Sequence, residues 1–136
     1  MAKILLIDDD EAITSVFDIT LRKEEFETVI AHTGEEGLEK AKSEKPDLIL
    51  LDQILPDMTG NEILKKLKED IETKLIPIAI LSNFGQNELI SEAMNLGASD
   101  YILKYQIEPG DLINKVKGLL KETKMSDSET HSTSSE

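Results

Sequence analysis

The chain has 136 residues, the length of one ordinary domain. It contains no cysteine, which excludes disulfide bonds, thiolate zinc sites and a cysteine nucleophile. Acidic residues outnumber basic residues by 28 to 15, so the formal net charge is −13. Such a charge repels nucleic acid and anionic lipid, so we expect no direct nucleic-acid binding and no membrane partner. It suits a protein that binds cations or a basic surface.

No segment has the length of a membrane span or the pattern of an export signal. The apolar run at residues 4–7 is far too short to cross a bilayer, and three aspartates follow it. We therefore expect a cytoplasmic protein.

Short apolar runs alternate with amphipathic stretches along most of the chain. The runs have the length of strands, and the stretches carry apolar residues at helical spacing. Two runs lack polar alternation, which is typical of parallel strands covered on both faces. Five such units predict a doubly wound α/β fold with helices on both faces of a parallel sheet. Strands are expected at 3–7, 26–31, 47–51, 77–81 and 101–103, and helices from 11, at 34–42, 61–70, 86–95 and from 109 to about 122.

The last residues have a different composition. Residues 123–136 contain eight Ser or Thr and one strongly apolar side chain, Met125. Because such a segment has too little apolar surface to bury, we expect it to be a disordered acidic tail. We therefore divide the chain into a domain at 1–122 and a tail at 123–136.

Polar side chains stand where the predicted strands end. Ligands of open α/β sheets bind outside the carboxyl ends of the strands, so these side chains are the candidate site. They are Asp8, Asp9 and Asp10 after the first strand, Asp52 after the third, Ser82 and Asn83 after the fourth, and Lys104 after the fifth.

Several of these candidates are carboxylates, which repel one another and raise each other's pKa unless a cation lies among them. Oxygen ligands without Cys or a nearby His pair favour Mg²⁺ over zinc. Ser82 and Lys104 would serve phosphate oxygens, so the set indicates phosphoryl transfer onto, or next to, a carboxylate. Asp10 directly precedes a helix, and we expect it to be an N-cap rather than a ligand.

Four strings carry a resemblance to a known family. In chain order, KILLIDDDEA, DLILLDQILPDMTG, IAILS and GASDYILK resemble the receiver domain of two-component response regulators. Each string closes a predicted strand, and the resemblance covers residues 3–122. It implies a flavodoxin-like five-stranded parallel sheet in the strand order 2-1-3-4-5.

The resemblance also implies roles for single residues. Asp52 would be the phosphoacceptor, and Lys104 would pair with the phosphoryl oxygens. Ser82 would be the switch hydroxyl that is drawn to the phosphoryl group, and Tyr101 would be the switch aromatic that follows it.

The resemblance implies Mg²⁺ as the cofactor. Asp8, Asp9 and Asp52 would position the ion, with Asp9 the more direct ligand of the acidic pair. The backbone carbonyl of Ile54 would be a further ligand.

Two positions depart from the family pattern. A proline usually follows the lysine, often after a cis bond, but here Tyr105 follows Lys104. A non-proline cis bond costs about 3 kcal/mol, so we expect a trans bond and a differently shaped loop. Asn83 stands where a small residue is usual after the switch hydroxyl, and we expect it to alter the lifetime of the phosphorylated form.

These features predict a stand-alone receiver and not an enzyme with a separate substrate. Its reactions would be its own phosphorylation and dephosphorylation. A sensor histidine kinase or a histidine phosphotransfer protein would be the donor, and output would be docking to a downstream target protein or onward relay. We expect no output domain, because the last helix and the tail use the residues that follow Lys104.

Two alternatives stay open. A phosphatase of the haloacid dehalogenase type would use Asp8 as its nucleophile, with Asp10 completing an Asp-x-Asp pair. It should also have an acidic pair at a strand end after its lysine, and none follows Lys104. A degenerate receiver would be a docking module without phosphorylation. The intact set of site residues argues against it, whereas Tyr105 leaves it possible.

Overall fold

The computed structural model describes the backbone of residues 1–135 and the side chains of residues 1–122. Strands and helices alternate along the described chain, as the sequence predicts. The elements are β1 Lys3–Ile7, α1 Glu11–Lys23, β2 Glu27–Ala31, α2 Gly34–Ser43, β3 Leu48–Asp52, α3 Gly60–Glu69, β4 Ile78–Ser82, α4 Asn87–Asn95, β5 Asp100–Leu103 and α5 Pro109–Ser135.

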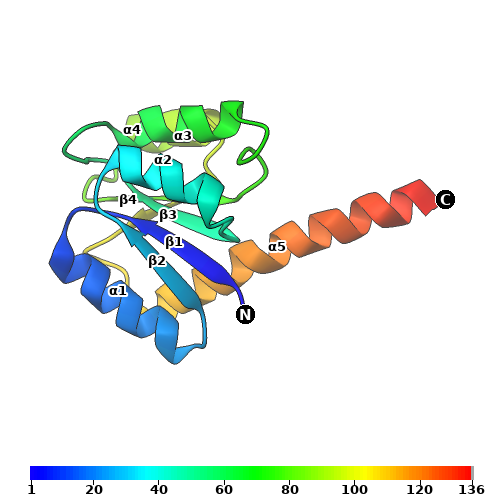
Figure 1. The fold of residues 1–136 in the computed structure, drawn as a ribbon, viewed down its shortest axis with the longest axis horizontal. Coiled ribbons are helices and arrows are strands. Elements are labelled where there is room, and N and C mark those ends of the chain that lie inside the picture. Colours follow the sequence, from blue (N-terminus) through cyan, green and yellow to red (C-terminus); the bar gives the residue numbers. More distant parts are fainter. Residues whose placement is uncertain (136) are drawn as a thin grey trace.

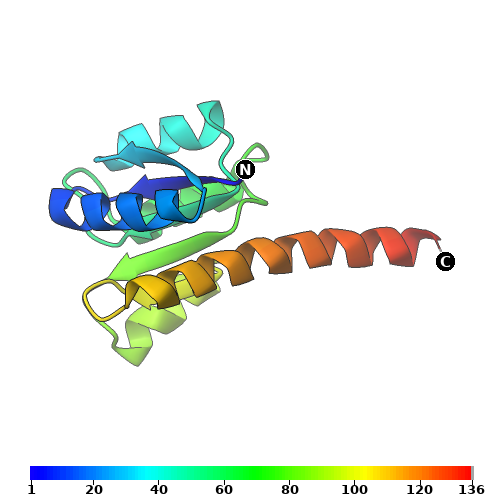
Figure 2. The same cartoon turned by 90° about the horizontal axis from the view of Figure 1, so that it is seen from below.

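The strands form one parallel sheet in the order β2-β1-β3-β4-β5. Helices α2, α3 and α4 cover one face of this sheet, and α1 and α5 cover the other (Figure 1). A view turned by 90° shows α1 and α5 on the same side of the strands (Figure 2). The predicted fold class and strand order are therefore confirmed.

The core has two layers because successive side chains of a strand point to opposite faces of the sheet. In β1, Ile4 and Leu6 pack in the layer under α1 and α5, while Leu5 and Ile7 pack in the layer under α2, α3 and α4. All four side chains are fully buried, and each stabilises the fold by about 1.5–3 kcal/mol. This burial on both faces explains why the central runs lack polar alternation.

Three helices begin at a side chain that caps them. The carboxylate of Asp10 accepts the backbone N–H groups of Ala12 and Ile13, which caps α1 and confirms its predicted role. The hydroxyls of Thr33 and Thr59 cap α2 and α3 in the same way.

The element bounds differ from the predicted ones by about one residue at several ends. The carboxylate of Asp52 and the hydroxyl of Ser82 belong to the last residues of β3 and β4, so they stand within the hydrogen-bonded sheet. Helix α5 ends at Ser135, whereas the sequence predicts an end near residue 122. No Gly or Pro follows Gly118 to stop a helix. The side chains of residues 123–136 lie outside the described part, so the disordered tail stays a prediction.

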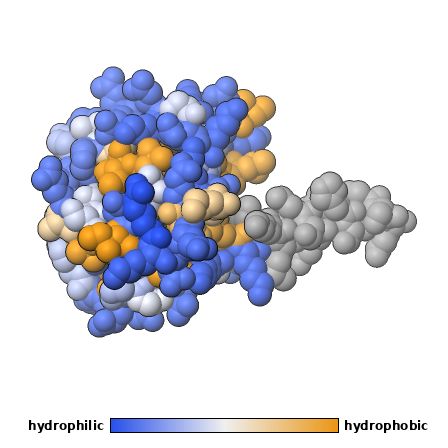
Figure 3. Space-filling view, turned by 60° about the horizontal axis from the view of Figure 1, so that its bottom comes forward, coloured by the Kyte–Doolittle hydropathy of each residue, from blue (hydrophilic) through white to orange (hydrophobic). Residues whose placement is uncertain are grey.

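The surface matches the acidic composition. The face that carries α1 and α5 is mainly hydrophilic, with small separate hydrophobic patches (Figure 3). Val16 and Ile19 of α1 are among the exposed large hydrophobic residues. None of the helices in the described residues is long and apolar enough to cross a membrane.

Candidate functional site

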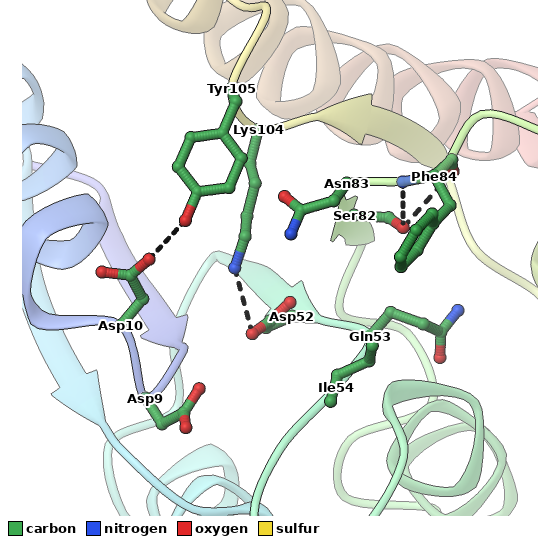
Figure 4. A pocket seen from close by; sticks show the side chains of 10 residues that line it. All are labelled: Asp9, Asp10, Asp52, Gln53, Ile54, Ser82, Asn83, Phe84, Lys104 and Tyr105. Atoms are coloured by element: carbon green, nitrogen blue, oxygen red, sulfur yellow. Dashed lines mark hydrogen bonds and ion pairs between the residues drawn. The ribbon is translucent and has the colours of Figure 1, made fainter.

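An open cavity of about 320 Å³ lies where the carboxyl ends of β1, β3, β4 and β5 meet. Four connecting loops therefore contribute side chains to one place, although they are far apart in the sequence. Figure 4 shows the side chains that line it. They belong to Asp9, Asp10, Asp52, Gln53, Ile54, Ser82, Asn83, Phe84, Lys104 and Tyr105.

Three carboxylates converge at this cavity. Asp8, Asp9 and Asp52 each offer an oxygen, and these oxygens lie within 4.8 Å of one another. Asp8 follows the inner strand β1, and its N–H donates to the carbonyl of Ala31 as if the strand continued. Asp8 is fully buried and Asp52 is 4 % exposed, while Asp9 is exposed. The acidic cluster therefore runs from the core to the solvent.

Lys104 lies between the two buried carboxylates. Its Nζ is 3.2 Å from Oδ2 of Asp8 and 3.2 Å from Oδ2 of Asp52. The backbone N–H of Lys104 donates to the carbonyl of Ser82. This bond extends the pairing of β4 and β5 and holds the backbone from which the Lys104 side chain starts. Figure 4 shows the ammonium group above Asp52. One positive charge thus faces two negative charges at a buried site.

This imbalance shifts the pKa values of the site. Burial raises the pKa of Asp52 to about 7, and the charge and hydrogen bonding of Asp8 raise it as well, while Lys104 opposes the shift. Burial alone would lower the pKa of Lys104, but the carboxylates of Asp52 and Asp8 outweigh it and raise that pKa. The site therefore holds excess negative charge that a cation would neutralise.

The donor set fits Mg²⁺. It consists of carboxylate oxygens from Asp8, Asp9 and Asp52, and hard divalent cations prefer such ligands. Ile54 lines the same cavity. The ligand role of its backbone carbonyl stays a prediction.

The end of β4 joins Ser82 to Tyr101 through the backbone of Phe84. The N–H of Phe84 donates to Oγ of Ser82 at 3.0 Å, and the hydroxyl of Tyr101 donates to the carbonyl of Phe84 at 2.7 Å. The resemblance pairs Ser82 with Tyr101, but nothing in the sequence indicates that Phe84 connects them. Asn83 lines the cavity from the same loop, opposite Lys104 (Figure 4).

The loop after Lys104 makes a contact that the sequence does not predict. The hydroxyl of Tyr105 donates to Oδ2 of Asp10 at 2.5 Å, across the cavity edge. This contact lowers the pKa of Asp10 and raises the pKa of Tyr105. No cis peptide bond occurs among the described residues, so the Lys104–Tyr105 bond is trans, as expected without proline.

The loop between β3 and α3 is held closely against the end of β3. Gly60 donates its N–H to the carbonyl of Gln53 at 2.7 Å, and a Cβ atom at Gly60 would lie 2.6 Å from the carbonyl oxygen of Asp52. The carboxylate of Asp57 accepts the N–H groups of Gly34 and Glu35 at the start of α2, and these bonds lower the pKa of Asp57. This second cap cannot be predicted from local sequence, because Asp57 and α2 are distant along the chain.

Comparison with known proteins assigns this architecture to a family. The family model described as "Response regulator receiver domain" matches residues 4–117. The chain belongs to this family. This receiver domain is therefore a component of two-component signalling, and the resemblance found in the sequence is confirmed.

Solved receiver structures match nearly the whole fold. A CheY-like receiver domain protein of Methanospirillum hungatei is 34% identical with a TM-score of 0.86, over 93% of this chain and 98% of that chain. The chemotaxis protein CheY4 of Vibrio cholerae is 30% identical with a TM-score of 0.82, over 88% and 98% of the two chains.

Curated relatives are longer than this receiver domain. The alkaline phosphatase synthesis transcriptional regulatory protein PhoP of Bacillus subtilis is 34% identical over 123 residues, which cover 90% of this chain and 50% of PhoP. The chain thus spans about half the length of the curated relatives it matches.

Proposed function

We propose that this receiver domain accepts a phosphoryl group on Asp52, and that Mg²⁺ assists the transfer. The observation that carries the proposal is the position of Asp52. It is the carboxylate that both lines the cavity and lies 3.2 Å from Lys104. Asp8, the other partner of Lys104, is fully buried beneath the cavity.

The transfer would use side chains that line the cavity. An oxygen of Asp52 attacks the phosphorus of a phosphohistidine, and the phosphorus–nitrogen bond breaks. Its electron pair goes to the imidazole nitrogen, which takes up a proton from water. The Lys104 ammonium group and the Ser82 hydroxyl would then bind phosphoryl oxygens, and bound Mg²⁺ would supply further positive charge.

The donor would be a sensor histidine kinase or a histidine phosphotransfer protein. We propose that the domain acts on no separate substrate, and that its output is docking to a downstream protein or onward relay. We also propose a cytoplasmic location, which the high net charge favours. That charge disfavours direct contact with nucleic acid, although some relatives are named transcriptional regulators.

The two alternatives have less support. A phosphatase of the haloacid dehalogenase type needs Asp8 as an accessible nucleophile, yet Asp8 is fully buried and paired with Lys104. A docking module without phosphorylation would not need a carboxylate, a hydroxyl and an ammonium group around one cavity.

Intact mass after incubation with acetyl phosphate and Mg²⁺ tests the proposal. Samples are quenched from the first seconds onward, for wild type, Asp52→Asn, Asp8→Asn and the exposed control Glu39→Gln. We expect the mass of one phosphoryl group in wild type and the control, and its loss in Asp52→Asn. A label that survives Asp52→Asn but not Asp8→Asn would favour the phosphatase. A wild type that never takes the label would favour the docking module.

A further inference from the structure

The two oxygens of the Asp10 carboxylate have separate partners. Oδ1 accepts the N–H groups of Ala12 and Ile13 and thereby caps α1. Oδ2 accepts the hydroxyl of Tyr105 at 2.5 Å. One aspartate therefore ties the start of α1 to the loop between β5 and α5, and these segments are far apart in the sequence.

The ring of Tyr105 forms part of the cavity wall. It lines the cavity next to Lys104, whose Nζ lies 5.8 Å from the ring centroid. Figure 4 shows the ring reaching from the β5–α5 loop toward Asp10, beside the Lys104 side chain. Tyr105 is 62% exposed, so it lines the cavity at a place where little protein packs on the residue.

The hydrogen bond between Tyr105 and Asp10 uses none of the side-chain groups that phosphorylation would give new partners. Lys104 would leave Asp8 and Asp52 to bind phosphoryl oxygens, and those carboxylates would contact Mg²⁺. The hydrogen bond between Tyr105 and Asp10 involves none of these groups. It can therefore hold the β5–α5 loop in place while Lys104 changes partners.

We propose that Tyr105 is a positioning residue that, anchored on Asp10, holds its ring across this side of the cavity and restricts the access of water and small phosphodonors to Asp52. The proposal rests on the proposed phosphorylation of Asp52. In hydrolysis, a water oxygen attacks phosphorus and the bond from phosphorus to the Asp52 oxygen breaks. Its electron pair returns to the carboxylate, and inorganic phosphate and one proton are released. The ring would slow this attack by occupying part of the approach.

Variants of Tyr105 and Asp10 test this restriction of access to Asp52, which we call the gate. Tyr105→Ala removes the ring, and Tyr105→Phe keeps the ring but removes the anchor. Asp10→Ser and Asp10→Asn form a matched pair, because both remove the charge and both residue types cap helices well. Serine is too short to reach Tyr105, whereas the asparagine amide can still bond to the tyrosine hydroxyl.

The measured quantities are the rate of phosphorylation by acetyl phosphate with Mg²⁺ and the rate of hydrolysis after donor removal. We expect both rates to rise together in Tyr105→Phe and in Asp10→Ser, by about two- to tenfold, the factor that one lost hydrogen bond allows. Tyr105→Ala should give the largest rise, and Asp10→Asn should stay closer to wild type than Asp10→Ser. Mg²⁺ affinity should change little in the Tyr105 variants, since its proposed ligands are untouched.

Other roles of Tyr105 would change the two rates differently. If Tyr105 only kept Lys104 in position, phosphorylation would slow in its variants, and this result would overturn the gate. Unchanged rates in Tyr105→Ala and Asp10→Ser would also overturn it. A wild type that takes no phosphoryl group onto Asp52 would overturn the proposed function and the gate with it, whereas a labelled wild type with unchanged variants overturns the gate alone.

Discussion

The hydroxyl of Tyr101 donates a 2.7 Å hydrogen bond to the backbone carbonyl of Phe84. The N–H of Phe84 in turn donates to the hydroxyl oxygen of Ser82 at 3.0 Å. A movement of Ser82 toward the cavity would therefore disturb Phe84 first and Tyr101 through it. This chain of contacts gives the proposed switch a physical connection between its two side chains.

Phosphorylation should release the amide of Phe84. If Ser82 turns its hydroxyl to a phosphoryl oxygen, the Phe84 N–H loses its acceptor, and we expect its hydrogen exchange to become faster. Exchange measured by NMR before and after phosphorylation with Mg²⁺ checks this. The amide of Ile49, which donates to the carbonyl of Pro77 within the sheet, is the internal control. Equal exchange of the Phe84 amide in both forms would show that Ser82 does not move.

Removal of Lys104 should destabilise the domain more at pH 8 than at pH 6. Lys104→Met leaves Asp8 and Asp52 buried together without a cation, and loss of one partner of a buried ion pair costs about 3–5 kcal/mol. At pH 6 the loss is smaller, because the pKa of Asp52, already about 7, rises further and the group binds a proton. Urea unfolding without Mg²⁺ at both pH values measures the difference.

The matched control for this change is Lys115→Met. Lys115 lies 3.2 Å from Asp100, the same distance as in the buried pairs, but its side chain is 42% exposed. Water screens such pairs, so we expect a loss of at most about 1 kcal/mol. Losses of similar size in the two variants would contradict the view that Lys104 balances the buried carboxylates.

Much of the site could be predicted because parallel strands bring their carboxyl ends to one edge. Asp8, Asp52 and Lys104 follow or end apolar runs, so the alternation of strands and helices predicts that they lie at one edge of the sheet. Their meeting also depends on the strand order, which the resemblance to receiver domains supplied. The contact between Tyr105 and Asp10 could not be predicted in this way. It joins two loops, and loop conformation leaves no periodic signal in the sequence.

Other loop contacts depend on how a loop folds or on backbone groups, and neither can be predicted from residue type. Asp57 caps α2 only because the β3–α3 loop folds back toward Gly34. Phe84 connects the switch residues through backbone groups, which every residue type carries, so its side chain gives no indication of this role. The available signal for Tyr105 was its aromatic hydroxyl, which stands directly after Lys104 at the same edge of the sheet as the acidic residues that follow β1.

The ionisation of Asp52 should make stability depend on pH. Its pKa is raised to about 7 in the folded protein from an ordinary value of 3.8, so the folded state binds the proton more tightly. The contribution of Asp52 to the free energy of unfolding therefore falls as pH rises from about 4 to 7 and stays low above pH 7. Asp52→Asn removes this loss and should be more stable than wild type at pH 8, on the order of a few kcal/mol.

The difference between wild type and Asp52→Asn isolates this group from the other carboxylates. Urea unfolding at pH 5, 6, 7 and 8 without Mg²⁺ measures the free energy of unfolding of both proteins. The gap between Asp52→Asn and wild type should widen up to about pH 7. In the control variant Glu39→Gln, at an exposed residue, the free energy of unfolding should change with pH as it does in wild type. A gap that narrows with rising pH would mean that the pKa of Asp52 is lowered by Lys104 rather than raised by burial and Asp8.

Gly60 should tolerate no side chain, because backbone atoms that cannot yield occupy the space. A Cβ atom there would lie 2.6 Å from the carbonyl oxygen of Asp52 and 2.8 Å from Cα of Gln53. We expect Gly60→Ala to lower the free energy of unfolding by about 1–3 kcal/mol and to slow phosphorylation by displacing Asp52. Gly118→Ala, in α5 where the added carbon meets nothing within 4 Å beyond the nearby backbone of its own helix, should instead stabilise by about 0.5–1 kcal/mol. Wild-type stability and labelling rate in Gly60→Ala would show that the loop yields, and that this close approach does not position the phosphoacceptor.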